Sequence, residues 1–197
     1  VSVTYGYAHP DLRTAVLAPG MCQQPCWHDI EIGQTKGIEA INLLLIDNSL
    51  EVDTSPQNNC SFLTFSQAEK EQSWWGCVSA IDPATPVLSI FIKFETNGNT
   101  FADALSLLGV PEAIWCEMPS MGNSLLTKTF FARFDNGVTL RLVDPNSDDR
   151  SPLSPMMSLD LVEYHSVRDR RLPMDINRTD AFNWRGFRPF TYEPCLE

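Results

Sequence analysis

The segment TFFARFDNGVTLRLV, residues 129–143, constrains the fold most, because its hydrophobic residues alternate on both sides of a turn signal. Successive side chains of a strand lie on opposite faces of a sheet, so this alternation predicts two half-buried strands. A two-residue Asn-Gly loop would set Arg133 opposite Leu140. A three-residue loop instead pairs Ala132 with Leu140 and leaves Gly137 in a left-handed bulge, which keeps one face apolar. The segment therefore predicts an antiparallel hairpin with a three-residue loop.

Two other segments also alternate. VLSIFIKF at 87–94 has one strongly apolar face, as expected of a strand packed on a core. MMSLDLVEYH at 156–165 predicts a last strand with Met157, Leu159 and Leu161 pointing inward.

A second hairpin is predicted from CSFLTF and SWWGCVSAI, which are joined by the polar stretch SQAEKE. One register sets Cys60 directly opposite Cys77 and Phe62 opposite Trp75. Cross-strand neighbours lie close enough for their sulfur atoms to bond. This register therefore predicts a disulfide between Cys60 and Cys77.

Two helices are predicted from similar segments, EAINLL at 39–44 and DALSLL at 103–108, which follow one another at a spacing of 64 residues. Apolar residues recur in both at helical spacing. Thr35 and Thr100 precede them, where a hydroxyl can accept a hydrogen bond from a backbone N–H of the first turn, and Thr100 with Asp103 approximates a capping box. The shared pattern indicates an internal duplication.

These elements together predict an α+β fold of two related helix-then-antiparallel-strand units, with the helices packed on one face of an antiparallel sheet. We expect an extended N-terminal segment at 1–21, a first helix-plus-sheet repeat at 22–96 and a second at 97–166. A C-terminal tail at 167–197 is expected to pack on the body.

The charge of the chain excludes one class of partner. Its formal net charge is -11, and no dense stripe of Lys and Arg offsets it locally, so nucleic acid is not expected to bind. The longest apolar run, INLLLI, is far shorter than the ~18 residues that suggest a spanning helix, so no membrane span is expected within the chain.

The six cysteines, an even number, predict three disulfides and an oxidising compartment. We therefore expect an extracytoplasmic protein that is secreted, periplasmic or anchored by a removed N-terminal segment, since the chain begins at Val1 and not at Met. The predicted disulfide cysteines are Cys22, Cys26, Cys60, Cys77, Cys116 and Cys195.

The arrangement CxxxCWHxIxxGxT at 22–35, followed by TFADALSLLGVPE and a late WRGF, resembles a group of uncharacterised bacterial extracytoplasmic proteins. The GxT helix starts and the LLGxP helix end are similar, more weakly, to the helix-plus-sheet repeats of small outer-membrane assembly lipoproteins and of the β-lactamase inhibitor proteins. Those folds bind other proteins through a sheet and carry no active site. The first helix departs from them, with LLIDN where LGxP is expected, so the resemblance implies fold more than partner.

Cys22, Cys26 and His28 form an alternative site, because thiolates and an imidazole are suitable zinc ligands. With Asp29 beside them, they would centre a metal-binding protein or a hydrolase-like enzyme. No second Cys/His pair follows at ligand spacing, and no G-x-S-x-G or H-E-x-x-H motif occurs. A local disulfide, or a clasp to a distant cysteine, is the favoured interpretation. We expect no catalysis, no cofactor and no metal.

A binding face follows from the alternation of the predicted strands. We expect the side toward the helices to carry Phe62, Trp75, Ile90 and Phe134. Large apolar residues on the opposite side would form an aromatic face that binds another protein. One form of this function is a subunit role in a membrane-associated complex. Alternatively, the C-terminal tail covers that face. The predicted binding-face residues are Leu63, Phe65, Trp74, Phe91 and Phe131.

Overall fold

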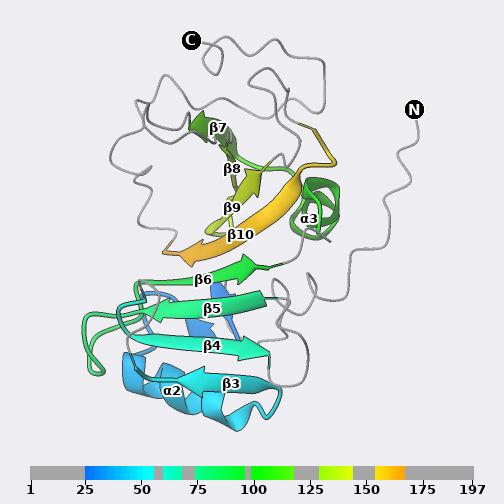
Figure 1. Cartoon of the computed structure of the whole chain (residues 1–197). Helices are drawn as coiled ribbons and strands as arrows, with labels where there is room; N and C mark the ends of the chain where they lie inside the picture. The colour runs from blue at the N-terminus through cyan, green and yellow to red at the C-terminus, as the bar shows by residue number, and fades with distance from the viewer. Residues whose placement is uncertain are drawn as a thin grey trace, which may run out of the picture.

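The chain forms one large antiparallel sheet with two short helices, as the computed structural model in Figure 1 shows. The structure describes residues 25–55, 60–67, 74–95, 99–117, 129–143 and 154–166. The elements in chain order are β1 (Cys26–Trp27), β2 (Ile30–Glu31), α2 (Gly37–Ile46), β3 (Leu50–Asp53), β4 (Leu63–Gln67), β5 (Trp74–Ser79), β6 (Ser89–Phe94), α3 (Phe101–Leu108), β7 (Ala113–Glu117), β8 (Thr129–Arg133), β9 (Val138–Val143) and β10 (Ser158–His165).

The large sheet has eight strands in the order β3-β4-β5-β6-β10-β9-β8-β7, and β1 with β2 forms a separate two-stranded hairpin. The predicted α+β class of two helix-then-strand units is therefore wrong. Strands β6 and β10 pair through five residues each, so the sheet continues from one half of the chain into the other. Local periodicity predicts strands but carries no information on pairing between segments so far apart in the sequence. The two helices have only 10 and 8 residues, so the structure is mostly sheet.

The register between β4 and β5 differs from the predicted one. Phe65 lies opposite Gly76, and Thr64 rather than Cys60 lies opposite Cys77. A Cβ atom built on Gly76 would lie 2.0 Å from Cζ of Phe65, so this register depends on a residue without a side chain. The Cys60–Cys77 disulfide is nevertheless confirmed, with a Cα–Cα distance of 5.8 Å.

The hairpin of β8 and β9 has the predicted three-residue loop. Ala132 lies opposite Leu140, and the backbone N–H of Phe134 donates to the carbonyl of Val138 at 2.8 Å. Gly137 has a φ of +80°, the left-handed conformation that a bulge of this kind requires. The alternation and the turn signal were enough to predict this hairpin correctly.

Strand β10 contains an irregularity that its sequence pattern did not indicate. Its pairing with β9 shifts register between Leu159 and Leu161. Leu159 remains inward and buried, as predicted, whereas Leu161 pairs with Arg141 on the other face of the sheet. Val162 and Tyr164 occupy the inward positions beyond the shift, and both are fully buried.

The two helices begin differently. Thr100 caps α3 as predicted: its hydroxyl accepts from the backbone N–H of Asp103, whose carboxylate accepts from the backbone N–H of Thr100 at 3.0 Å. Helix α2 begins after Lys36 and not after Thr35. The Thr35 hydroxyl accepts instead from the backbone N–H of Glu31 at 2.9 Å, and so holds the end of the β1–β2 hairpin.

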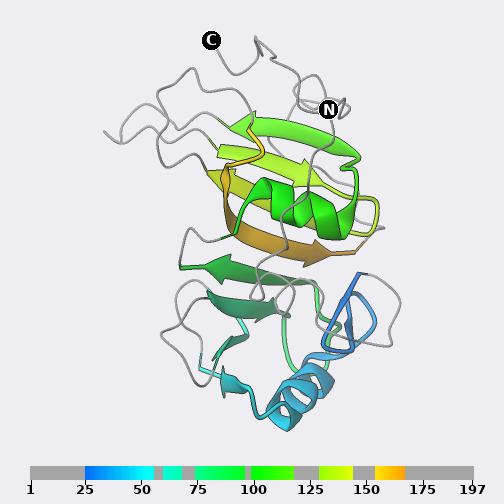
Figure 2. The same ribbon diagram turned by 90° about the vertical axis from the view of Figure 1, so that its right-hand side faces the viewer.

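Both helices pack on the same hydrophobic core. In Figure 1, α2 lies behind β3 and α3 lies to the right of β10; in Figure 2, α3 lies in front of the strands. The core also includes Trp27 and Ile30 from the small hairpin. The face of the sheet away from this core, called the open face below, carries no helix among the described residues. No helix in this part of the chain is long and apolar enough to cross a membrane. The predicted segments 1–21 and 167–197 lie outside the described residues.

Candidate functional site

The pairing of the strands brings side chains from six of them into one line on the open face. Each residue lies directly opposite the next one, so the line runs perpendicular to the strands. Because neighbouring strands lie about 4.8 Å apart, its first five residues span roughly 19 Å. We call this line the cross-strand row; from β5 to β7 it consists of Trp75, Lys93, Leu161, Arg141, Phe131 and Trp115.

Aromatic rings gather at both ends of the cross-strand row. The Trp75 ring contacts that of Phe91 edge-on, with centroids 5.3 Å apart, and Trp115 stacks on Phe131 at the same distance. Trp115 is buried, whereas Trp75, Phe91 and Phe131 are half-buried. Three rings of the open face therefore keep part of their surface accessible.

Charged side chains separate these aromatic ends. The guanidinium of Arg141 forms an ion pair with Asp160, which lies at the register shift in β10, between Leu159 and Leu161. Glu163 lies beside Phe91 on the same face, and burial raises the pKa of its carboxyl while the nearby Arg141 opposes that shift. Arg141 therefore already has carboxylates of this chain around it.

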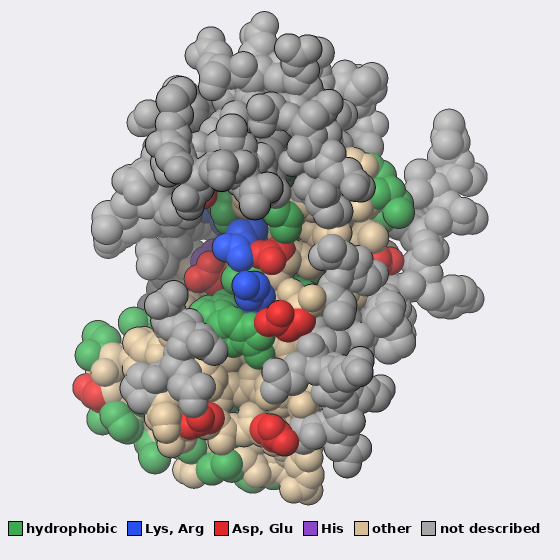
Figure 3. Space-filling model, in the orientation of Figure 1, with side chains coloured by type: hydrophobic (Ala, Val, Ile, Leu, Met, Phe, Trp, Pro, Cys, Tyr) green, Lys and Arg blue, Asp and Glu red, His purple; other side chains and the backbone are tan. Residues whose placement is uncertain are grey.

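Lys93 differs from the arginines of this face. Nε of Arg133 lies 3.5 Å from Oε2 of Glu112, so that guanidinium also has a carboxylate of its own. Within the described part of the chain, no Asp or Glu forms an ion pair with Lys93, which lies directly between Trp75 and Leu161. Figure 3 shows this face, with Lys and Arg side chains lying among hydrophobic and acidic ones over the middle of the sheet.

Three of the five predicted binding-face residues lie in the core and not on the open face. Leu63, Phe65 and Trp74 are at most 2% exposed and belong to the hydrophobic core on the helix side. Phe91 and Phe131, in contrast, lie on the open face. The predicted set therefore joined residues from the two sides of the sheet.

The error came from the position of one hairpin relative to β6. Trp75 was expected on the side of Ile90, but it pairs with Lys93 and so shares a face with Phe91. Alternation within a strand cannot decide which of two neighbouring tryptophans points inward. The available signal was Gly76, because a glycine leaves room for a large ring on the facing strand, and Phe65 fills that room.

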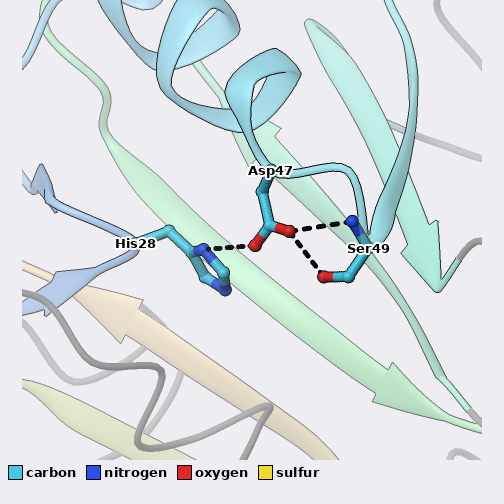
Figure 4. A network of polar contacts seen from close by, with 3 residues as sticks. All are labelled: His28, Asp47 and Ser49. Atoms are coloured by element: carbon cyan, nitrogen blue, oxygen red, sulfur yellow. Dashed lines mark hydrogen bonds and ion pairs between the residues drawn. The ribbon is translucent and has the colours of Figure 1, made fainter.

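A second group of polar residues, shown in Figure 4, joins the loop of the β1–β2 hairpin to the end of α2. Trp27 pairs with Ile30, and the two-residue loop between them has positive φ at both positions, 48° at His28 and 62° at Asp29. Positive φ is uncommon for residues other than glycine, and Asp and His are among the side chains that adopt it most often. The Trp27 ring contacts that of His28 at 4.1 Å, which positions the imidazole.

His28 pairs with the residue that ends α2. Nδ1 of His28 lies 3.3 Å from Oδ2 of Asp47, whose other oxygen accepts from the backbone N–H and the hydroxyl of Ser49 at 2.9 and 2.6 Å. Burial lowers the pKa of His28, although Asp47 and Asp29 oppose the shift. Burial alone would raise the pKa of Asp47, but the Ser49 hydrogen bonds and His28 lower it. Nε2 of His28 is buried without a hydrogen-bond partner in the described structure.

The state of Cys26 bears on the alternative zinc site. Cys26 is disulfide-bonded, and a disulfide sulfur is not the thiolate that zinc requires. Among the residues that the structure describes, no three His, Cys, Asp or Glu side chains come together to hold a metal ion. Cys116 is also disulfide-bonded, whereas the predicted cysteines Cys22 and Cys195 lie outside the described residues.

Comparison of the chain with protein-family models, with curated proteins and with solved structures found no match.

Proposed function

We propose that this chain is an extracytoplasmic, non-catalytic module that binds another protein through the open face of its sheet. The observation that carries the proposal is the half-buried pair Trp75 and Phe91 at one end of the cross-strand row. Aromatic residues on an accessible, largely apolar surface are enriched at the centres of protein interfaces. A subunit role in a membrane-associated complex is one form of this function.

The disulfides support the proposed compartment. Cys60 and Cys77 are bonded to one another, and no cysteine in the described structure is free. Disulfides persist in oxidising compartments and are rare where glutathione keeps thiols reduced. We therefore propose that the protein works outside the cytoplasm.

Site-specific photo-crosslinking in cells that make the protein tests the proposal. A photoreactive phenylalanine analogue at Phe91 should yield a discrete adduct of higher mass with a partner. The matched position is Ile46, which is 76% exposed at the end of α2 and lies away from the open face. The proposal fails if Phe91 gives no adduct, or if both positions give the same one.

Two adjacent tryptophans separate loss of binding from loss of folding. Trp75→Ala should abolish the adduct from Phe91 and leave the melting temperature nearly unchanged, because Trp75 lies half-buried on the open face. Trp74→Ala should instead destabilise the protein by about 3–5 kcal/mol, because Trp74 is buried in the core. Equal destabilisation by the two variants would show that Trp75 serves the fold and not a partner.

A further inference from the structure

We propose that the partner presents a carboxylate to Lys93, flanked by apolar side chains that contact Trp75 and Leu161. This inference rests on the proposed function and adds the chemistry of the partner. In the cross-strand row Lys93 has an apolar neighbour directly opposite it on each side, about 4.8 Å away at the strand spacing. An acidic residue between apolar ones therefore matches this part of the open face.

The charges of the open face single out one position. The described residues include fourteen Asp and Glu but four Lys and Arg, and three of those four lie on the open face: Lys93, Arg133 and Arg141. The same face also carries carboxylates, among them Glu51, Asp53 and Glu163, so the unpaired cation and not the sign of the whole face selects the partner. Electrostatic complementarity at interfaces selects the partner whose charge is opposite to that of the local surface.

Lys93 is the cation of this face that is available to a partner. Glu112 pairs with Arg133, and Asp160 pairs with Arg141, whereas no carboxylate in the described structure pairs with Lys93. Covering an ammonium group with an apolar partner would remove its water without replacement, which carries a high free-energy cost. A carboxylate opposite Lys93 removes that cost, so it is the partner group that the face favours.

The formal net charge of -11 does not oppose this pairing at short range. Charges more than about 8 Å apart are largely screened at physiological ionic strength. Glu51 and Asp53 on β3 lie three strand steps from Lys93, or roughly 14 Å. Glu163 is nearer, because it lies diagonally across from Lys93 on β10, at roughly 7–8 Å. A group in contact with the Lys93 ammonium is therefore nearer to it than to these carboxylates.

Two defined peptides test the inference directly. The first is a fluorescein-labelled decapeptide of alternating Glu and Phe, and the second has Lys in place of every Glu. Fluorescence anisotropy should show that the wild-type protein binds the acidic peptide about tenfold or more tightly than the basic one. Lys93→Arg should keep this preference, and Lys93→Glu should abolish or reverse it.

Lys36 provides the matched control for net charge. It is exposed at the start of α2, and Lys36→Glu changes the formal charge by the same amount as Lys93→Glu. The preference for the acidic peptide should survive in Lys36→Glu. Equal affinity for both peptides, no binding of the acidic one, or the same loss in both charge variants would overturn the inference.

The crosslinking experiment distinguishes this failure from failure of the proposed function. If Phe91 forms an adduct whose yield is unchanged in Lys93→Glu, a partner binds the open face but does not present a carboxylate to Lys93. If Phe91 forms no adduct, the proposed function itself fails. Loss of the adduct in Lys93→Glu, with retention in Lys93→Arg and Lys36→Glu, supports both.

Discussion

Replacing Gly76 by alanine should destabilise the protein by about 2 kcal/mol. A Cβ atom at this position would lie 2.0 Å from Cζ and 2.3 Å from Cε2 of Phe65, well inside van der Waals contact. The Phe65 ring has no room to move aside. It stacks on Trp27 at 4.6 Å, meets Trp74 edge-on at 6.1 Å, and is 2% exposed.

The magnitude follows from two opposing terms. Forcing one extra carbon into a well-packed core costs about 1–3 kcal/mol, and the upper end applies at Gly76 because the facing ring is held on both sides. Replacing glycine by alanine restricts the unfolded chain and so stabilises the folded state by about 0.4–1 kcal/mol. The difference is a net loss of about 2 kcal/mol.

A double-mutant cycle in urea, followed by tryptophan fluorescence with the disulfides intact, measures this effect. Phe65→Ala alone should cost about 3–5 kcal/mol, because it leaves a cavity beside Trp27. In that background Gly76→Ala should stabilise the protein by about 0.4–1 kcal/mol, since the overlapping ring is gone and only the effect on the unfolded chain is left. The coupling free energy is therefore about 3 kcal/mol, the cost of the overlap. A Gly76→Ala protein as stable as the wild type, or an equal cost in both backgrounds, would refute the packing argument.

Three other predictions concern stability. Burial lowers the pKa of His28, so the folded protein favours the neutral imidazole. The contribution of His28 to the free energy of unfolding is therefore complete above the unfolded pKa of about 6.5 and is lost as the pH falls below it. Urea midpoints measured between pH 7.5 and 5 should decrease with falling pH, and His28→Asn should make this decrease smaller. An unchanged decrease in His28→Asn would mean that other groups cause the acid sensitivity. Gly137→Ala should lower the free energy of unfolding by about 2 kcal/mol or more, because its Cβ would lie 2.6 Å from a backbone oxygen. Gly109 has a similar φ of +82° but open space around it, so Gly109→Ala should cost about 1 kcal/mol in the same thermal unfolding experiment. Equal costs would show that backbone strain alone matters. Replacing Cys60 and Cys77 together by alanine should lower the free energy of unfolding by about 3 kcal/mol, because the disulfide closes a loop with a sequence separation of 17 and so restricts the unfolded chain. Calorimetry that shows no loss of stability in this variant would contradict the prediction.

The parts of the fold that depend on neighbouring residues could be predicted from the sequence. The capping box of Thr100 and the hairpin loop before Val138 are both fixed within a few residues, and both are confirmed. The Cys60–Cys77 disulfide was also predicted, although from a register that the structure does not have. The two sulfur atoms can bond without Cys60 lying directly opposite Cys77, so the disulfide constrained the hairpin less than the prediction assumed.

The parts that depend on distant pairing could not be predicted. Alternation gives each strand two faces but does not say which face of one strand continues which face of the next. One wrong choice at the β5–β6 junction exchanged Trp74 for Trp75 and moved Leu63 and Phe65 to the open face. The register shift before Leu161 had a similar effect, because a bulge reverses the side on which later residues point.

The candidate site depends more than any other feature on pairing between distant strands, because the cross-strand row runs perpendicular to the strands. Lys93 looks like an ordinary solvated position within VLSIFIKF, where it alternates with inward apolar residues. It becomes distinctive only when β10 pairs with β6 and brings Leu161 beside it, 68 positions further along the chain. An unpaired cation between Trp75 and Leu161 is thus a property of the strand order and not of any local motif. Cys26 and His28, in contrast, are neighbours in the sequence, so their cluster is visible without the strand order.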